Sequence, residues 1–487
     1  MKTHLTRLRA RLIAPVLLIL SAATTVGVAG ANTLPDLGTA AVSTLTIEKE
    51  IEVGGFYMRV LRNQLPIVSD PVMNEYLNDV GYKLVANSNN VRTPFKFFLV
   101  NNSDINAFAF FGGHVGVHTA LFHHADSESE LASVLAHEVA HVTQRHLARS
   151  MEAQQKNAPA TLAGVLGSIL LAMAAPEAGI AALQSTLALG QQAQINYTRS
   201  NELEADRIGM QAMVAAGFDP YAAPSFFGKL AAQYRFASKP PAMLMTHPLP
   251  ESRIADTRNR AARYPQRNIP DNLMFQLAKA RAQVRFSNYS AERAMDVFDR
   301  QLRQPTYPFK DAAHYGKALA HFRMDDFAEA EMLIVNLLAK EPQNLFYLDT
   351  YTDIMLATDR HDSAIETLER ARKNRPNNSV IDLNLANAYL ESNQPKQARA
   401  ILERHLVLSK DDLVVYDLLA QTYQKLDMPA ERHMIQAEIL ALRADYPRAI
   451  DQLQHAYRLS RSNALQLARI DARIKQLRSA EQQMRNL

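Results

Sequence analysis

The chain of 487 residues contains no cysteine. Disulfide bridges, thiolate metal sites and a lipid-modified N-terminal cysteine are therefore excluded. The composition is otherwise ordinary for a globular protein, with 47% hydrophobic and 21% charged residues. A chain of this length is expected to fold into roughly two to four domains.

Excess positive charge is also missing once the N-terminus is set apart. The formal net charge is +4, and residues 1–31 carry four basic side chains and no acidic one. Removing them leaves a net charge of about zero, so no nucleic-acid partner is predicted. These basic residues precede an apolar run, Leu12–Leu20, and a small-residue segment that ends at Ala29-Gly30-Ala31. The pattern predicts a cleaved secretory signal peptide over residues 1–31, and the shortness of the run argues against a membrane anchor.

The most informative motif that is present is His137-Glu138-Val139-Ala140-His141, within a helical pattern from Asp126 to Glu152. Two histidines four residues apart lie on one helix face, so both imidazoles can reach one metal ion. Glu138 lies about 100° round the helix, where it can act as general base on a water molecule. Ser127 and Glu130 form a capping box at the start of this helix. The motif predicts one zinc ion per chain and hydrolysis of peptide bonds, although these donors would also accept cobalt or manganese.

A catalytic zinc usually has three protein ligands, and the third must come from elsewhere in the chain. Glu202 and Asp206 are four residues apart at the start of another helical pattern. In one interpretation Glu202 binds the metal and Asp206 orients a ligand histidine. In the other interpretation, these acids form a solvated face that pairs with Arg207. Glu204 is expected to face outward in either case.

Metzincins, which place a third histidine six residues after the second, are excluded because Leu147 stands at that position. His146 is predicted to be a surface or hydrogen-bonding histidine, about 140° away from the ligand face. Two strands are predicted, Phe95–Val100 and His114–His118, with a Gly112-Gly113 turn before the second. A strand beside the metal helix would either bind an extended peptide by edge pairing or serve only as a structural hairpin.

Residues 158–190 are rich in alanine, leucine and glycine. The apolar run Leu162–Ala175 is too short to span a bilayer, and Pro176 interrupts it. We expect a helical hairpin beside the metal helix, which either packs in the core or forms a lid or a peripheral membrane contact.

The C-terminal part of the chain is repetitive, and its period of about 34 residues is that of the tetratricopeptide repeat. This spacing separates Ala330, Ala364 and Ala398, Pro342 and Pro376, and Tyr389 and Tyr423. Small residues at helix crossings and proline at the repeat end are typical of such repeats, whose stacked helix pairs form a protein-binding solenoid. The match weakens after about residue 430, where Arg432 replaces the expected alanine, and Ala449 onward is predicted to restart the array or form a capping helix.

These patterns predict a mostly α-helical chain. An α+β peptidase domain of the zincin type with a small sheet, residues 46–265, is followed by a helical connector, residues 266–306. An α-solenoid of tetratricopeptide repeats occupies residues 307–487.

The motif His137-Glu138-x-x-His141 followed by Glu202-x-x-x-Asp206 resembles the M48 family of zinc peptidases. The stretch Asn106–Gly113 and the triplet Thr246-His247-Pro248, with Arg253 downstream, also fit that family. The resemblance implies that His137, His141 and Glu202 bind zinc and that Glu138 is catalytic. It also implies a catalytic role for Asp206, sometimes given as proton donor. His247 would assist at the oxyanion or occupy the open zinc position at rest, unless it is only a structural residue of a His-Pro turn.

A signal peptide, an M48 domain and a repeat array together resemble the periplasmic members of the family that act in outer-membrane protein assembly. That resemblance implies docking of the repeats on the β-barrel assembly machinery. The protein substrates would be outer-membrane proteins, matured when they assemble and degraded when they misassemble. The rival hypothesis is a chaperone or scaffold whose metal site is latent.

Overall fold

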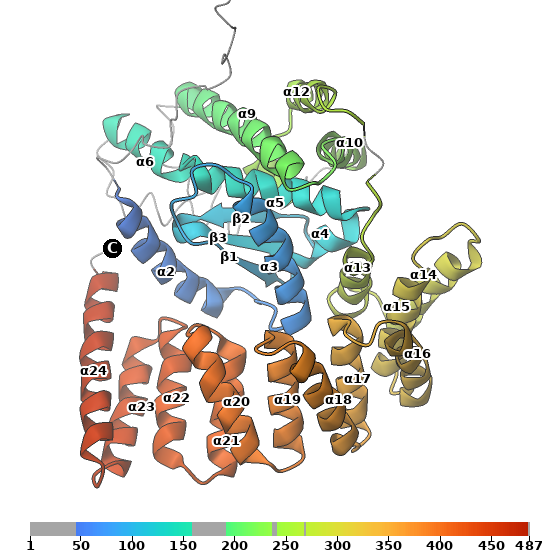
Figure 1. Ribbon diagram of the computed structural model, residues 1–487. Coiled ribbons are helices and arrows are strands. Elements are labelled where there is room, and N and C mark those ends of the chain that lie inside the picture. Colours follow the sequence, from blue (N-terminus) through green and yellow to red (C-terminus); the bar gives the residue numbers. More distant parts are fainter. Residues whose placement is uncertain (1–44, 158–190, 236–240, 267–268, 486–487) are drawn as a thin grey trace, which may run out of the picture. The chain divides into compact units, whose positions relative to one another are not determined.

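A computed structural model describes residues 45–157, 191–235, 241–266 and 269–485. The expected signal peptide and the expected hairpin at residues 158–190 lie outside the described residues. The described chain is mostly α-helical with one three-stranded sheet, which confirms the predicted fold class (Figure 1). Among the described residues, no helix combines the length and the apolar character needed to cross a membrane.

The sheet contains β1 (Lys96–Val100), β2 (Ala107–Phe110) and β3 (His114–His118), in the order β1-β3-β2. Strand β3 pairs in parallel with β1 and antiparallel with β2. Both predicted strands are confirmed, but β2 was not predicted. Because β3 is the central strand, it offers no free edge for pairing with a peptide. The strand with an outer edge beside the helix of the HExxH motif is β2.

The turn between β2 and β3 depends on two glycines. Gly112 and Gly113 have φ of 75° and 74°, in the left-handed region. A Cβ on Gly113 would lie 2.0 Å from the carbonyl oxygen of Pro94, so only glycine fits there. The predicted turn is therefore present.

Helices cover both faces of the sheet because its strands alternate the side to which their apolar side chains point. Phe98 and Val100 of β1 share a buried cluster with Met58 and Leu61 of α2. The neighbouring residue Leu99 points to the other face, into the main core. The helices around the sheet are α2 (Ile47–Gln64), α3 (Pro71–Ala86), α4 (Thr119–His124) and α5 (Glu128–Thr143).

The helix that carries the HExxH motif ends earlier than predicted. The Ser127 side chain accepts a hydrogen bond from the Glu130 amide, as the capping box requires. Helix α5 ends at Thr143, and α6 (His146–Asn157) begins after Arg145, whose φ is 53°. The expected single helix from Asp126 to Glu152 is wrong at this point. Arginine is an unusual residue for the left-handed region, so the sequence carried no signal for the bend.

Helix α9 (Gln191–Ala215) packs along α5 (Figure 1). The two backbones approach closely at Gly209, where a Cβ would lie 2.9 Å from the carbonyl oxygen of Ala136. Three further helices follow: α10 (Ala222–Tyr234), α11 (Ala242–Thr246) and α12 (Glu251–Ala261).

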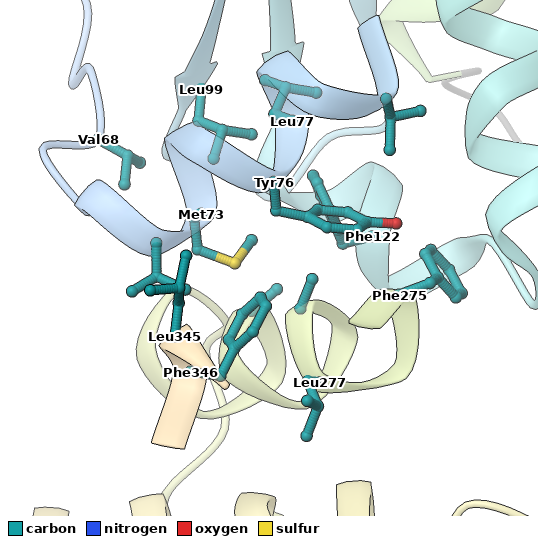
Figure 2. Close-up of a cluster of buried hydrophobic side chains, with 14 of the residues drawn as sticks. Val68, Met73, Tyr76, Leu77, Leu99, Phe122, Phe275, Leu277, Leu345 and Phe346 are labelled. Atoms are coloured by element: carbon teal, nitrogen blue, oxygen red, sulfur yellow. The ribbon is translucent and has the colours of Figure 1, made fainter. Parts of the chain in front are cut away.

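One buried core continues from the sheet into the repeats (Figure 2). The Tyr76 ring of α3 contacts Phe122 of α4 at 6.2 Å and Phe346 of α17 (Leu345–Ala357) at 6.3 Å between ring centroids. Arg281 of α13 (Leu273–Arg285) is 1% exposed and pairs with Asp70, at the start of α3, and with Asp349 of α17. The first repeats are thus anchored on α3 and α4 by apolar packing and by a buried ion pair.

The rest of the described chain consists of antiparallel helix pairs. They are α13 (Leu273–Arg285), α14 (Ala291–Arg303), α15 (Lys310–Arg323), α16 (Phe327–Lys340), α17 (Leu345–Ala357), α18 (His361–Asn374), α19 (Ser379–Glu391), α20 (Pro395–Leu408), α21 (Leu413–Lys425), α22 (Pro429–Ala441), α23 (Tyr446–Leu459) and α24 (Ala464–Arg485). The turn inside each of four successive pairs contains a residue with positive φ. These residues are spaced by one repeat length and are Asp325, Asp359, Asn393 and Asp427. Aspartate and asparagine tolerate this conformation better than other side chains, so the turn repeats with the sequence.

Candidate metal centre

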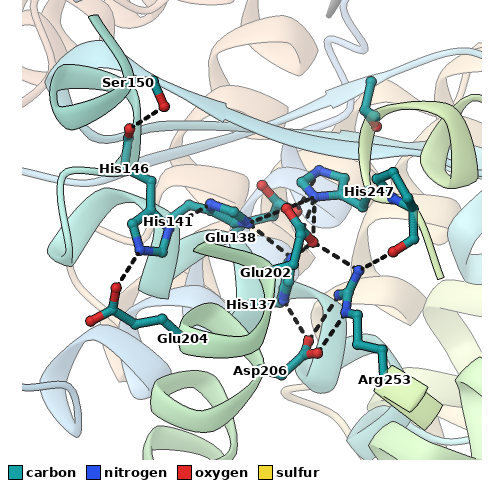
Figure 3. A network of polar contacts seen from close by, with 12 residues as sticks. His137, Glu138, His141, His146, Ser150, Glu202, Glu204, Asp206, His247 and Arg253 are labelled. Carbon is teal, nitrogen blue, oxygen red and sulfur yellow. Dashed lines mark hydrogen bonds and ion pairs between the residues drawn. The ribbon is translucent and has the colours of Figure 1, made fainter. Parts of the chain in front are cut away.

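The two motif histidines lie on the last two turns of α5 and point to the same place (Figure 3). The Nε2 atoms of His137 and His141 are 2.9 Å apart. Residues Leu131 to Ala140 are all buried, because α5 packs between the sheet and α9. The apolar surroundings therefore enclose two imidazoles whose nitrogens face each other.

Glu202 reaches the same place from α9. Its Oε2 lies 3.2 Å from Nε2 of His137, and its Oε1 lies 3.4 Å from Nε2 of His141. Glu202 and Asp206 are buried, with exposed fractions of 5% and 7%, so the alternative of a solvated acidic face is wrong. Burial alone would raise the pKa of Glu202, but the neighbouring histidines, His247 first, lower it well below the usual value.

His247 joins the cluster from the end of α11. Its Nδ1 is 3.1 Å from Oε1 of Glu202 and 3.4 Å from Nε2 of His137. Its Nε2 is 3.5 Å from Oε1 of Glu138. One ligand atom from each of His137, His141, Glu202 and His247 lies within 4.8 Å of the others.

This donor set fits a zinc ion. Zinc in proteins prefers imidazole nitrogen and carboxylate oxygen in a four-coordinate arrangement, and the four converging groups are of these types. Glu138 is 1% exposed, and its Oε1 has no hydrogen-bond partner among the described residues. Nε2 of His247, at 3.5 Å, is too distant to satisfy this buried oxygen, which favours a closer water or substrate atom as its partner during function.

Asp206 lies behind His137, on the side away from the cluster. Its Oδ1 is 2.9 Å from Nδ1 of His137, and Arg253 binds both of its oxygens at 2.6 and 2.9 Å. Burial alone would raise the pKa of Asp206, but the hydrogen bonds and charges of Arg253 and His137 together outweigh burial and lower that pKa. Arg253 also donates to the carbonyl oxygen of Pro248 at 2.9 Å, so it ties Asp206 to the turn that carries His247.

The two histidines of the motif differ in their electrostatic surroundings. Burial disfavours the charged form of both, but Asp206 and Glu202 raise the pKa of His137 to about 10. Burial lowers the pKa of His141 well below its usual value, despite the attraction of Glu202. The acids thus act mainly on the pKa of His137, and burial acts mainly on the pKa of His141.

His141 has its own partners on the opposite side of the cluster. Nδ1 of His146 is 2.9 Å from Nδ1 of His141, and Nε2 of His146 is 3.1 Å from Oε2 of Glu204. His146 is 3% exposed, so the expectation of a surface histidine is wrong, while that of a hydrogen-bonding one is right. Glu204 does not face outward as predicted, because it points toward His146 and Arg149. The hydrogen bond from His146 is the main reason that the pKa of Glu204 falls to about 2.

The structure brings all six predicted site residues together: His137, Glu138, His141, Glu202, Asp206 and His247. Sequence reasoning missed the pairing of His146 with Glu204. The sequence signal for this pairing was weak, because in a continuous helix a histidine five residues after His141 lies on another face. Only the bend at Arg145 brings His146 back beside His141.

Comparison with known proteins agrees with this geometry. The profile of peptidase family M48 matches residues 71–261, and a tetratricopeptide repeat profile matches residues 355–422. The chain is 48% identical over 455 residues to the beta-barrel assembly-enhancing protease of Escherichia coli O157:H7, covering 93% of each chain. The chain belongs to peptidase family M48. This M48 peptidase is also 48% identical over 444 residues to the putative beta-barrel assembly-enhancing protease of Vibrio cholerae, covering 91% of this chain and 92% of the relative.

A more distant relative matches a shorter stretch of the chain. The Arabidopsis thaliana mitochondrial metalloendopeptidase OMA1 is 33% identical over 132 residues, which cover 27% of this M48 peptidase and 25% of that protein. The family and these relatives establish that the chain is a metalloendopeptidase with a helical repeat arm linked to it.

Proposed function

We propose that the chain is a zinc-dependent endopeptidase in which His137, His141 and Glu202 hold one zinc ion. The observation that carries this proposal is the convergence of their ligand atoms, with that of His247, within 4.8 Å in a buried site. When bound, zinc would polarise the scissile carbonyl and make a water molecule more acidic.

Glu138 is the proposed general base. Its carboxylate is buried beside the cluster, and Oε1 is free of hydrogen bonds among the described residues. In the reaction Glu138 would accept the proton of the attacking water and deliver it to the leaving amine. Asp206 is engaged by Arg253 and His137, so its proposed contribution is to orient His137 rather than to donate a proton.

His247 is proposed to fill the open position at the metal in the resting state. Its Nδ1 lies as close to Glu202 as the motif histidines do, which supports a ligand role over a purely structural one. In His247→Leu we expect faster cleavage if the residue only blocks the site, and slower cleavage if it assists at the oxyanion. Unchanged cleavage and unchanged zinc geometry would leave only the structural role.

The repeat arm suggests where the enzyme acts. Relatives named beta-barrel assembly-enhancing proteases match this chain, repeats included, over nearly their whole length. We infer a periplasmic enzyme, exported by the signal peptide at residues 1–31, whose repeats dock on the outer-membrane β-barrel assembly machinery. Its protein substrates would be outer-membrane proteins, which it helps to mature and degrades when they misassemble.

A second function, a scaffold with a latent metal site, is favoured by one observation only. His247 stands within the ligand cluster, where it would compete with substrate for the metal. In that case zinc would bind, but casein would not be cleaved, and Glu138→Gln would leave the biological effect of the protein unchanged.

The deciding experiment measures zinc content and casein cleavage for the mature protein, Glu138→Gln and the control Glu329→Gln, an exposed residue of α16. We expect about one zinc per chain in all three proteins. Cleavage should fall by about 10²- to 10⁴-fold in Glu138→Gln alone, because general acid–base catalysis contributes an effect of that size. Absence of zinc, or equal cleavage by all three, would contradict the proposed activity.

A further inference from the structure

His141 is held from behind by a chain of polar contacts that runs to α9 (Figure 3). Its Nε2 faces the ligand cluster, and its Nδ1 lies 2.9 Å from Nδ1 of His146. The other nitrogen of His146 lies 3.1 Å from Oε2 of Glu204. His146 and Glu204 are thus aligned behind His141, on the side opposite Asp206.

The direction of each hydrogen bond follows from which group can donate. A carboxylate only accepts, so the Nε2–H of His146 donates to Glu204. A neutral His146 then has a lone pair on Nδ1, which accepts the Nδ1–H of His141. This tautomer of His141 leaves its Nε2 lone pair facing the ligand cluster, as a metal ligand requires.

The backbone is bent to place His146 there. In a continuous helix, His146 would lie about 140° away from His141 round the axis. Arg145 instead adopts a φ of 53°, and its buried guanidinium is held by Oε1 of Glu50 at 2.8 Å and by the Leu45 carbonyl oxygen at 2.6 Å. A non-glycine residue in this region is strained and persists only where its surroundings fix it. The strain at Arg145 is therefore linked to the contact between His146 and His141.

Glu204 is fixed in its turn. Arg149 donates to its Oε2 at 2.9 Å, so this carboxylate faces a cation as well as His146. The side chain of Glu204 is only 13% exposed, and that of His146 only 4%. Neither residue can reorient without losing its partners.

We propose that His146 and Glu204 are positioning residues that set the tautomer and orientation of His141 for metal binding. The inference rests on the proposed zinc site. It gives the two motif histidines separate supports, Asp206 with Arg253 for His137, and His146 with Glu204 for His141. Partners of this kind typically contribute about 10- to 100-fold to metal affinity.

The test measures zinc affinity by competition with a chelator for the full mature chain. His146→Ala should weaken zinc binding about 10- to 100-fold. His146→Asn should restore most of this loss, because the asparagine Oδ1 stands where Nδ1 of histidine does and can accept the same proton from His141. Glu204→Ala should cause a smaller loss, and His321→Ala, in α15 beside Asp326, should cause none.

Thermal unfolding of the metal-free proteins provides the second readout. A simple packing role for His146 would lower the unfolding temperature of His146→Ala and His146→Asn alike, without rescue of zinc binding by asparagine. If His146→Ala does not fold, the comparison of Glu204→Ala with Glu204→Gln decides, and equal zinc affinity of Glu204→Ala and the wild type would overturn the inference. If the wild type itself binds no zinc, the proposed activity fails first.

Discussion

The metal centre and the repeat array are both built from packed helices, but their contacts span very different lengths of chain. At the metal centre, His137 meets Glu202 from α9 and His247 from α11, the latter 110 residues further along. In the array, the Tyr389 hydroxyl donates to Glu369, and the same contact recurs one repeat later between Tyr423 and Glu403. The metal centre depends on contacts between segments that are distant in the sequence. The array depends on the same contact recurring between neighbouring helices.

This difference predicts how each region responds to change. A substitution that touches only neighbouring repeats should cost a similar, small amount of stability wherever it is made, because the stability of a repeat array is roughly a sum of repeat and neighbour contributions. A substitution at a helix crossing near the metal should affect several ligands together. The junction around Arg281 belongs to both regions, because its partner Asp70 caps α3 and its partner Asp349 lies on α17.

The largest expected effect is at this junction. Arg281 is 1% exposed and lies 2.7 Å from Asp70 and 2.6 Å from Asp349. Arg281→Met removes the nearest cation from two buried carboxylates, of which Asp70 keeps only Arg285 at 3.7 Å, and such a loss costs about 3–5 kcal/mol. We expect this decrease in the free energy of unfolding, measured with urea. The control is Arg360→Met, whose exposed pair with Glu331 should contribute at most about 1 kcal/mol.

Unfolding at low pH provides an independent test of the same junction. Burial would raise the pKa of Asp70, but the charges of Arg281 and Arg285 and the hydrogen bonds to this carboxylate together outweigh burial, and the folded pKa lies below the usual value. The stability from Asp70 is therefore complete above its unfolded pKa of about 3.9 and is lost as pH falls through the lower folded pKa. Arg281→Met should lack this part of the acid transition. Equal losses in Arg281→Met and Arg360→Met would show that the junction does not stabilise the fold.

A smaller effect is expected where α9 crosses α5. A Cβ added by Gly209→Ala would lie 2.9 Å from the Ala136 carbonyl oxygen and must push the helices apart, at about 1–3 kcal/mol. Since α9 also carries Glu202, zinc affinity should fall with stability. The control Gly228→Ala on α10, where a Cβ meets nothing within 4 Å, should raise stability by about 0.4–1 kcal/mol. Unchanged zinc affinity in Gly209→Ala would show that the ligands do not depend on this crossing.

The same contrast explains what the sequence could predict. The HExxH motif and the period of the repeats are local patterns, and the helices and repeats that they predict are present. Glu202 is far from His137 along the chain, and its pattern with Asp206 looks the same on a solvated helix as in a buried site. Only the packing of α9 on α5 distinguishes the two.

Two local features were missed for different physical reasons. All four residues of β2, Ala107–Phe110, are buried, so the strand shows no alternation of polar and apolar residues. The bend at Arg145 depends on Glu50, almost a hundred residues earlier, which no local propensity reveals. His146 was therefore placed on the wrong face, although its capacity for hydrogen bonding was expected.

The smallest expected effects are in the array. Asn344, Asn378 and Asp412 stand at equivalent positions of successive repeats and cap α17, α19 and α21 by accepting a hydrogen bond from a backbone amide of the first turn. Replacing any of them by alanine should cost about 1 kcal/mol of unfolding free energy and leave zinc affinity unchanged. Asn344→Ala and Asn378→Ala should cost more than Asp412→Ala, because the two amide groups also donate, to Glu341 at 2.9 Å and to Glu75 of α3 at 2.7 Å. A change in zinc affinity with any of the three would mean that the array and the metal centre are coupled beyond the junction at Arg281.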